Sequence, residues 1–199
     1  MMLVEVTAVP DGALPLEEFK AHLRAGSGFS ADSLQEEALR GFLRAACSAV
    51  EGRTGKILLA RDFTWTVARW RDGRAEPFPV APVVEVLDVV SVSRDGDEKT
   101  IASERWWLEA DGSQPRLMAR GDVLPTVPMQ GSIRIAFRAG MAETWGALPA
   151  DIAQAVLMLA AHYYAFREAT GLGEGCVPFG VAVLLERYRA MRLLGGSLR

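Results

Sequence analysis

The stretch Leu148-Pro-Ala-Asp-Ile-Ala-Gln-Ala-Val-Leu-Met-Leu-Ala-Ala-His-Tyr-Tyr-Ala-Phe-Arg-Glu168 decides the fold, because its apolar residues recur with the period of an α-helix. That apolar face consists of Ile152, Val156, Leu159, Tyr163 and Phe166. The helical period begins at Pro149. A helix with one apolar face is marginal alone, so the pattern predicts a body in which other helices cover that face.

Three further segments show the same period and supply those helices. The first is Leu14-Pro-Leu-Glu-Glu-Phe-Lys-Ala-His-Leu-Arg24, in which the residues on one face are Leu16, Phe19 and Leu23. The second opens with Ser33 and Glu36 at capping-box spacing and ends at Gly55. Its apolar face contains Leu39, Phe42, Ala46, Ala49 and Val50. The last helix ends at Gly195-Gly196 and carries Val181, Leu184, Leu185, Tyr188 and Met191.

The middle of the chain has the period of β-strands instead. Apolar residues alternate with threonine in Phe63-Thr-Trp-Thr-Val67, residues 83–92 are rich in valine, and a final alternating strand stops at Gly140. Asp-Gly pairs at 72–73, 95–96 and 111–112 predict hairpin turns, and prolines at 77, 79 and 82 predict an edge strand or an extended connector. We therefore predict an α+β fold, with about four helices in residues 1–60 and 147–199 and an antiparallel β module inserted at residues 61–146.

Composition limits the classes of function. The 199 residues suffice for one domain or for one domain with an inserted module. The net charge of −3 argues against tight, non-specific DNA binding, which needs a basic excess. Half of the residues are hydrophobic, and surplus apolar surface often lies in a subunit interface. The first eighteen residues are acidic and the last fourteen are basic, so the ends are either simply solvated or include a basic tail that docks on an acidic partner.

The two cysteines, Cys47 and Cys176, belong to no CxxC motif or Cys/His cluster. We therefore expect neither a disulfide framework nor a metal site. Residues 1–9 lack the basic and apolar regions of a signal peptide, and no apolar run is long enough to span a membrane. The expectation is synthesis in a reducing cytoplasm and no membrane partner.

The sequence presents no arrangement that predicts catalysis or a cofactor. His22 and His162 lie on predicted helices, with no nucleophile motif beside them. The loop Gly171-Leu-Gly-Glu-Gly175 follows a helix rather than a strand, so it is not expected to bind phosphate. Glu104, Glu109 and Asp111 are close in sequence, but we expect them to be solvated carboxylates at a turn. A hydrolase whose site assembles from distant residues stays open as an alternative.

The tryptophans lie in or near the predicted β module, at Trp65, Trp70, Trp106, Trp107 and Trp145. Such residues stack on bases when they line a basic groove. Here the neighbouring arginines are offset by acidic residues. We therefore expect a role in the core and in interfaces rather than in binding nucleic acid.

Six stretches, in this order, carry a family resemblance: Leu14–Arg24, Ala45–Ile57, Pro82–Gly96, Ile133–Gly140, Leu148–Glu168 and Val177–Arg189. Together they resemble the head–tail connector (adaptor) proteins of long-tailed bacteriophages and of gene transfer agents. The chain departs from that family at Gly28-Phe-Ser-Ala-Asp-Ser33, where the family has an acidic run before the second helix.

This resemblance implies a structural protein in the neck of a virion or phage-like particle, with no enzymatic activity. The chain would form a homo-oligomeric ring of twelve subunits that binds the portal protein, lets DNA pass through its lumen without specific binding, and receives the next neck component, a stopper, underneath. The segment expected to reach the portal is Leu193, Leu194, Gly195, Gly196, Ser197, Leu198 and Arg199. A ring needs two different complementary faces per subunit. We expect contributions to the subunit interface from Phe19, Leu23, Phe42, Tyr163, Tyr164 and Phe166.

Three alternatives remain open. The chain could be another neck or tail-completion protein, such as a stopper or a tail terminator, which are commonly dominated by β structure. It could be the small hydrolase already mentioned. It could also be a DNA-binding module, which the charge balance disfavours.

Overall fold

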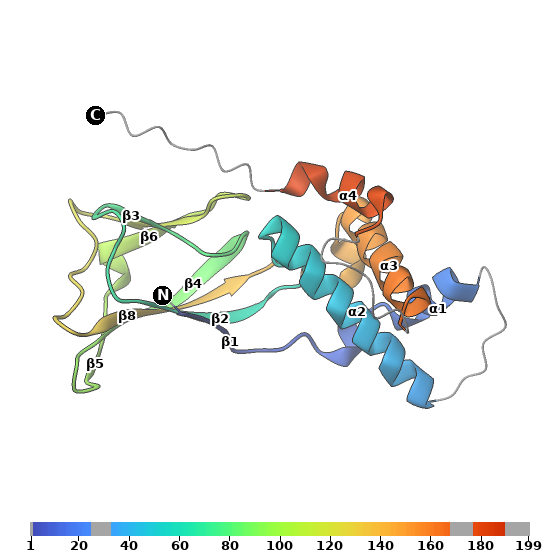
Figure 1. Cartoon of the computed structure of the whole chain (residues 1–199). Helices are drawn as coiled ribbons and strands as arrows, with labels where there is room; N and C mark the ends of the chain where they lie inside the picture. Colours follow the sequence, from blue (N-terminus) through green and yellow to red (C-terminus); the bar gives the residue numbers. More distant parts are fainter. Residues whose placement is uncertain (1, 25–32, 168–176, 190–199) are drawn as a thin grey trace. The chain divides into compact units, whose positions relative to one another are not determined.

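The computed structural model describes residues 2–24, 33–167 and 177–189, and Figure 1 shows the order of its elements along the chain. By their internal contacts the residues divide into two units. Met1–Leu16 and Lys56–Pro149 make the first, which we call the β unit. Glu17–Gly55 and Ala150–Arg199 make the second, the helical unit. The described residues confirm the predicted α+β class, with four α-helices and two antiparallel sheets.

The larger sheet of the β unit has five strands in the order β1-β2-β8-β4-β5. Their bounds are β1 (Met2–Glu5), β2 (Arg61–Val67), β8 (Ser132–Ala139), β4 (Val83–Val92) and β5 (Glu98–Thr100). In β2 and β8 every second residue is buried, because most apolar side chains lie on one face and most threonine or charged residues on the other; Arg61 on the buried face and Ala136 on the opposite face are the exceptions. The alternation read from the sequence thus predicted these two strands and their buried faces correctly.

The smaller sheet has three strands in the order β3-β7-β6. Their bounds are β3 (Ala75–Pro77), β7 (Arg116–Ala119) and β6 (Trp106–Glu109). Pro77 lies in an edge strand, as predicted, since proline cannot donate to a ladder on both sides. Side chains of both sheets form one hydrophobic cluster, in which Phe137 lies 5.6 Å from Phe63 and 5.0 Å from Phe78 between ring centroids.

Two of the three predicted hairpin turns are confirmed. Asp95-Gly96 joins β4 to β5, with Gly96 at a φ of 91° that favours glycine, and Asp111-Gly112 joins β6 to β7. The third prediction was wrong, because β2 and β3, on either side of Asp72-Gly73, belong to different sheets. There the carboxylate of Glu76 accepts a hydrogen bond from the amide of Arg71 at 2.6 Å, which shapes a wider loop.

Strand β1 was not predicted, because residues 1–60 were expected to belong to the helical part of the fold. Met2–Glu5 instead pairs with β2, and the amide of Val6 continues the contact with a hydrogen bond to the carbonyl of Asp62 at 2.8 Å. Four residues are too few to show the alternating period of a strand. Strand β1 can therefore be identified only from its pairing with β2. Three 3₁₀ turns complete the unit: η1 (Asp11–Ala13), η2 (Ser103–Arg105) and η3 (Trp145–Ala147).

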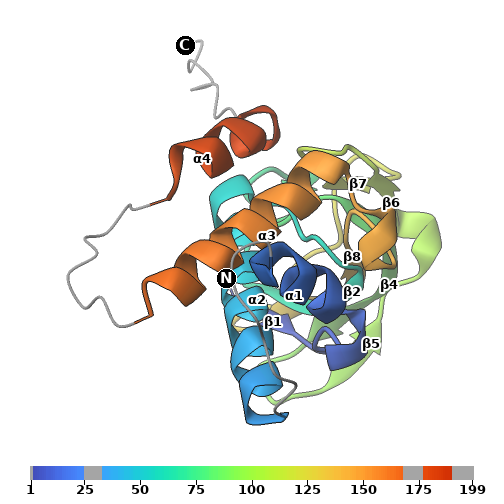
Figure 2. The ribbon, with the colours of Figure 1, turned by 90° about the vertical axis from the view of Figure 1, so that its right-hand side faces the viewer.

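The helical unit contains α2 (Ser33–Thr54), α3 (Ala150–Ala165), α4 (Phe179–Leu185) and most of α1 (Leu16–Arg24), with a last 3₁₀ turn η4 (Glu186–Tyr188). Helix α3 packs on both α2 and α4, and Figure 2 shows it crossing α2. The predicted apolar faces are buried at Phe19, Leu39, Val50, Ile152 and Leu159. Gly171, Met191 and Gly195-Gly196, predicted to end or line helices, lie outside the described residues.

Gly140, which directly follows β8, gives the first testable prediction. A Cβ atom added there would lie 2.3 Å from the Cα of Ala60, which is backbone and cannot rotate away. We expect Gly140→Ala to lower the free energy of unfolding by about 1–3 kcal/mol, measured by chemical denaturation. Gly112→Ala is the matched control, because nothing lies within 4 Å of its added Cβ. Equal stability of the two variants would contradict the close packing.

Candidate functional site

Both histidines, the first candidates for chemistry, lie in the helical unit. His22 is exposed on α1, and His162 is half-buried on α3 with its ring 4.7 Å from that of Phe166. Within the described parts of the chain, no three His, Cys, Asp or Glu side chains come together as metal ligands would. Over the same parts, no helix is long and apolar enough to cross a membrane. The loop Gly171–Gly175 lies outside the described residues.

The carboxylates near the β6–β7 turn have structural partners. Asp111 accepts hydrogen bonds from the amides of Ser113 and Gln114, both at 2.7 Å, and these bonds lower the pKa of its carboxyl. Glu109 pairs with Nε of Arg116 across the two strands at 2.7 Å. These residues shape and brace a hairpin, which agrees with the expectation of carboxylates at a turn.

The tryptophans contribute mainly to the packing of the β unit. Trp65 is fully buried and Trp145 nearly so. The indole N–H of Trp70 donates to the carbonyl of Pro125 at 2.7 Å, and that of Trp106 to Ile101 at 3.3 Å. Trp107 alone of the five is classed as exposed. The five tryptophans, all of them among the described residues, therefore form no exposed row that could stack on bases.

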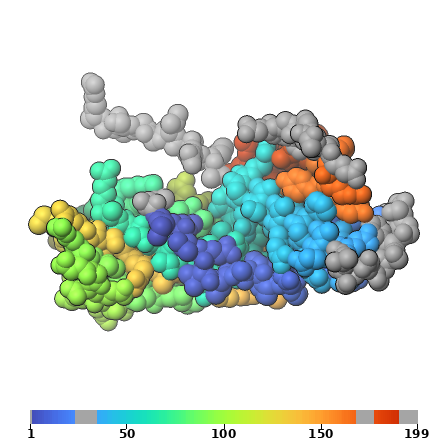
Figure 3. Space-filling model, turned by 60° about the horizontal axis from the view of Figure 1, so that its bottom comes forward, coloured from blue at the N-terminus to red at the C-terminus, as the bar shows by residue number. Residues whose placement is uncertain are grey.

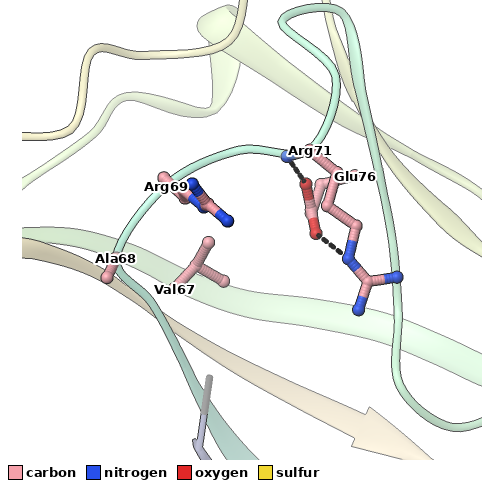
Figure 4. Close-up of a pocket in the computed structure, with 5 residues that line it drawn as sticks. All are labelled: Val67, Ala68, Arg69, Arg71 and Glu76. Atoms are coloured by element: carbon pink, nitrogen blue, oxygen red, sulfur yellow. Dashed lines mark hydrogen bonds and ion pairs between the residues drawn. The ribbon is translucent and has the colours of Figure 1, made fainter.

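A hollow of about 360 Å³ lies beside the loop after β2 and is lined by Val67, Ala68, Arg69, Arg71 and Glu76 (Figure 4). The Glu76 carboxylate is almost fully buried, and Nε of Arg71 lies 3.6 Å from it, in addition to the amide bond already described. A charge so held acts as a local brace rather than as a general base. Glu76 was not among the residues predicted from the sequence, because its burial depends on a loop that joins strands of two different sheets.

The outer face of the five-stranded sheet is the face opposite the hydrophobic cluster, and it carries paired charges of both signs. Arg134 on β8 pairs with Glu98 on β5 at 2.7 Å. Arg138 contacts Asp62 at 3.1 Å and Glu143 at 2.7 Å. Hydrogen bonds from these arginines lower the pKa of Glu98 and of Glu143. A face on which each cation has an acidic neighbour is poorly suited to phosphate binding.

The six residues expected at a subunit interface all belong to the helical unit. Phe19 is fully buried, so it belongs to the core of its own unit. Leu23, Phe42, Tyr163 and Tyr164 are half-buried, and Phe42 packs edge-on against Tyr164 at 5.9 Å between ring centroids. Phe166 is 47% exposed. The residues expected to contact the portal, 193–199, lie outside the described residues.

Sequence reasoning missed two other apolar surfaces, both in the β unit. Met2 and Val4 on β1 and the following Val6 are exposed, as are Val84 and Leu87 in the first half of β4. Their positions at the edges of the larger sheet could not be read before the strand order was known. In the space-filling view, the dark blue N-terminal segment lies open on the surface (Figure 3).

Comparison with known proteins gives a consistent result. No protein-family model matches the chain, and no curated protein matches it. Among solved structures, a chain in the neck of an empty gene transfer agent particle, computed with C6 symmetry, is 46% identical over 98% of this chain and 99% of that one, with a TM-score of 0.88. A chain in the neck of the native particle, computed with C12 symmetry, is 44% identical with the same coverage and a TM-score of 0.84. A chain of the virion of the native gene transfer agent particle is 46% identical, again over 98% of this chain and 99% of that one, with a TM-score of 0.87.

The fold therefore defines a structural protein of a phage-like particle. With this identity over nearly the whole of both chains, the chain belongs to the family of neck proteins of gene transfer agent particles. This agrees with the location in the neck that the sequence resemblance implied.

The Glu98–Arg134 pair leads to a pH-dependent prediction. Because the folded pKa of Glu98 is lowered, its contribution to stability is present above the ordinary glutamate pKa and is lost as the pH falls through the folded value. We expect Glu98→Gln to lower the thermal midpoint near pH 7, and to lower it by less at a pH below the ordinary glutamate pKa of about 4.3. Glu104→Gln, which removes the same charge from an exposed site on η2, is the control. A Glu98→Gln effect of the same size at both pH values would exclude the charged pair as its cause.

Proposed function

We propose that the chain is a head–tail connector (adaptor) that forms a ring between the capsid portal and the tail of a gene transfer agent or related particle. The observation that carries the proposal is the full-length similarity to chains solved in the necks of such particles. Full-length similarity supports transfer of the role more strongly than a shared fold alone would. The role is structural, with no enzymatic activity and no cofactor.

The proposed ring has twelve subunits. This number is supported by the C12 symmetry with which one similar neck was computed, and C6 symmetry is a subgroup of it. Closure of a ring requires a head-to-tail interface, in which each subunit presents two unlike surfaces. The exposed Phe166 and Phe179 of the helical unit, 47% and 84% exposed, are apolar surface of the kind that such contacts bury.

DNA would pass through the lumen of this ring without specific binding. The described outer sheet face supports this, because its arginines are paired with acidic side chains. The net charge of the chain, −3, likewise gives no general attraction for the phosphate backbone. A channel that must release DNA benefits from weak attraction.

The second candidate is a stopper, a neck component farther from the portal. Stoppers are commonly dominated by β structure, so a large helical part distinguishes an adaptor from a stopper. The described chain has a helical unit built on α2 of 22 residues and α3 of 16, which favours the adaptor. Electron microscopy of purified particles decides between them. A ring of this chain in direct contact with the portal supports the adaptor, a ring separated from the portal by another protein supports the stopper, and absence from the neck overturns both.

Deletion of Leu193–Arg199 tests the proposed contact with the portal. We expect the shortened chain to keep its circular dichroism spectrum, because Gly195-Gly196 marks a predicted helix end and the described helices stop before this segment. We also expect it to be lost from portal-bearing heads, measured by quantitative mass spectrometry of purified particles. Undiminished attachment of the shortened chain would refute the assigned contact.

A further inference from the structure

The five-stranded sheet has two open edges, and both display apolar side chains. At one end of the strand order, β1 pairs with β2 on one side, and no described strand pairs with its other side. At the other end, β5 pairs with β4 only at Val90–Val92, and the amide of Ile101 extends this contact to the carbonyl of Val89. Residues 83–88 of β4 therefore have no strand partner, among the described residues, on the side away from β8.

Both edges combine apolar side chains with only part of the usual protection against pairing with another chain. Natural edge strands are commonly very short or carry charged residues. Strand β5, which forms the edge beside Val90–Val92 of β4, follows this rule. It is the short, exposed segment Glu98-Lys99-Thr100. The open edges follow it only in part: β1 has four residues and ends at Glu5, and Glu85 and Asp88 lie in the open part of β4, but exposed apolar side chains stand beside them. On β1 and just after it, Met2, Val4 and Val6 are 60%, 43% and 60% exposed, and on β4, Val84 and Leu87 are 51% and 50% exposed.

Two irregularities produce the apolar surface of β4. The register with β8 shifts between Val83 and Glu85 and again between Val86 and Asp88. Val84 and Leu87 are thus the extra residues of two bulges. Bulges often blunt an edge, but here the inserted residues are valine and leucine instead of lysine or glutamate. Such residues suit an edge that is covered in the assembled protein.

The directions of the two edges are complementary. Each strand in the series β1-β2-β8-β4 is antiparallel to its neighbour, so β1 and β4 run in opposite directions. In a ring, each copy is related to the next by a rotation. If the rotation axis is nearly parallel to the strands, corresponding strands of the two copies run in the same direction. Strand β1 of one copy then lies beside β4 of the next as an antiparallel pair, with the same sheet face outward in both. The open segments, residues 2–6 and 83–88, also have similar lengths.

We propose that β1 of one copy docks against the first half of β4 of the neighbouring copy, so that the five-stranded sheets join edge to edge around the ring. This inference rests on the proposed ring, and it names two surfaces that give the head-to-tail interface its unlike halves. Val4 and Val6, which the registers place level with residues 85–88 of β4, face Val84 and Leu87 across the contact, in addition to any contact made by the helical units.

A photo-cross-linking amino acid at Val4, in the full-length chain within assembled particles, tests the proposal. The expected product is a dimer of this chain whose cross-linked peptide contains residues 83–88. Within one copy, β1 and β4 are separated by β2 and β8, about 14 Å away, so the adduct should form between copies. The same amino acid at Val123, which is 60% exposed in a loop outside both edges, should give no adduct to residues 83–88.

Every outcome of this experiment is decisive. An adduct from Val4 to the portal, to another neck protein or to a different segment of this chain overturns the edge-to-edge contact while leaving the adaptor role intact. The same holds if this chain is in the neck and forms no adduct. If particles contain no copy of the chain in the neck, the proposed function fails, and the contact fails with it.

Charge substitutions provide a second, independent measurement. We expect Val4→Lys or Leu87→Lys to reduce the amount of this chain in purified necks by about ten-fold or more, because each buries an unpaired charge in the contact. Val4→Lys combined with Leu87→Glu should restore much of it, since the two charges then attract. Val123→Lys is the matched control. Incorporation of both single variants at the wild-type level, with unchanged thermal midpoints, would overturn the proposal.

Discussion

The packing of Phe137 between Phe63 and Phe78 is the contact on which the β unit depends. Phe63 and Phe137 come from adjacent strands of the larger sheet, whereas Phe78 directly follows β3 of the smaller sheet and also contacts Trp65, at 5.3 Å between ring centroids. These rings join the two sheets into one hydrophobic cluster. They also fix which face of each strand is buried, because a strand that exposed these rings would lose most of its apolar burial.

That constraint determines what remains on the surface. Once the aromatic face is buried, the opposite face of the larger sheet presents Asp62, Arg134 and Arg138 with their partners, and it is polar and balanced in charge. The apolar side chains that the core does not use then lie at the edges of the sheet. Such a distribution suits contact with other protein subunits better than contact with nucleic acid. Physical features and similarity to neck proteins therefore indicate the same kind of role.

Several polar groups of the described residues are engaged in contacts that support the fold. The most buried carboxylate, Glu76, braces a loop through the amide and guanidinium of Arg71. The carboxylate of Asp111 holds a turn, and the ring of His162 packs against Phe166. Glu76, Asp111 and His162 thus each support the fold locally.

The sequence by itself determined the α+β class, the helices near residues 33–54 and 150–165, and the alternation of β2 and β8, because periodicity and turn residues are local properties of the chain. It failed at β1 and at Asp72-Gly73, where a short strand and a loop take their form from distant partners. The strand order, the open edges at β1 and β4, and the burial of Glu76 were decided only by the tertiary structure. Pairing between residues far apart in sequence leaves no local pattern, so these features become visible only when the sheets are assembled.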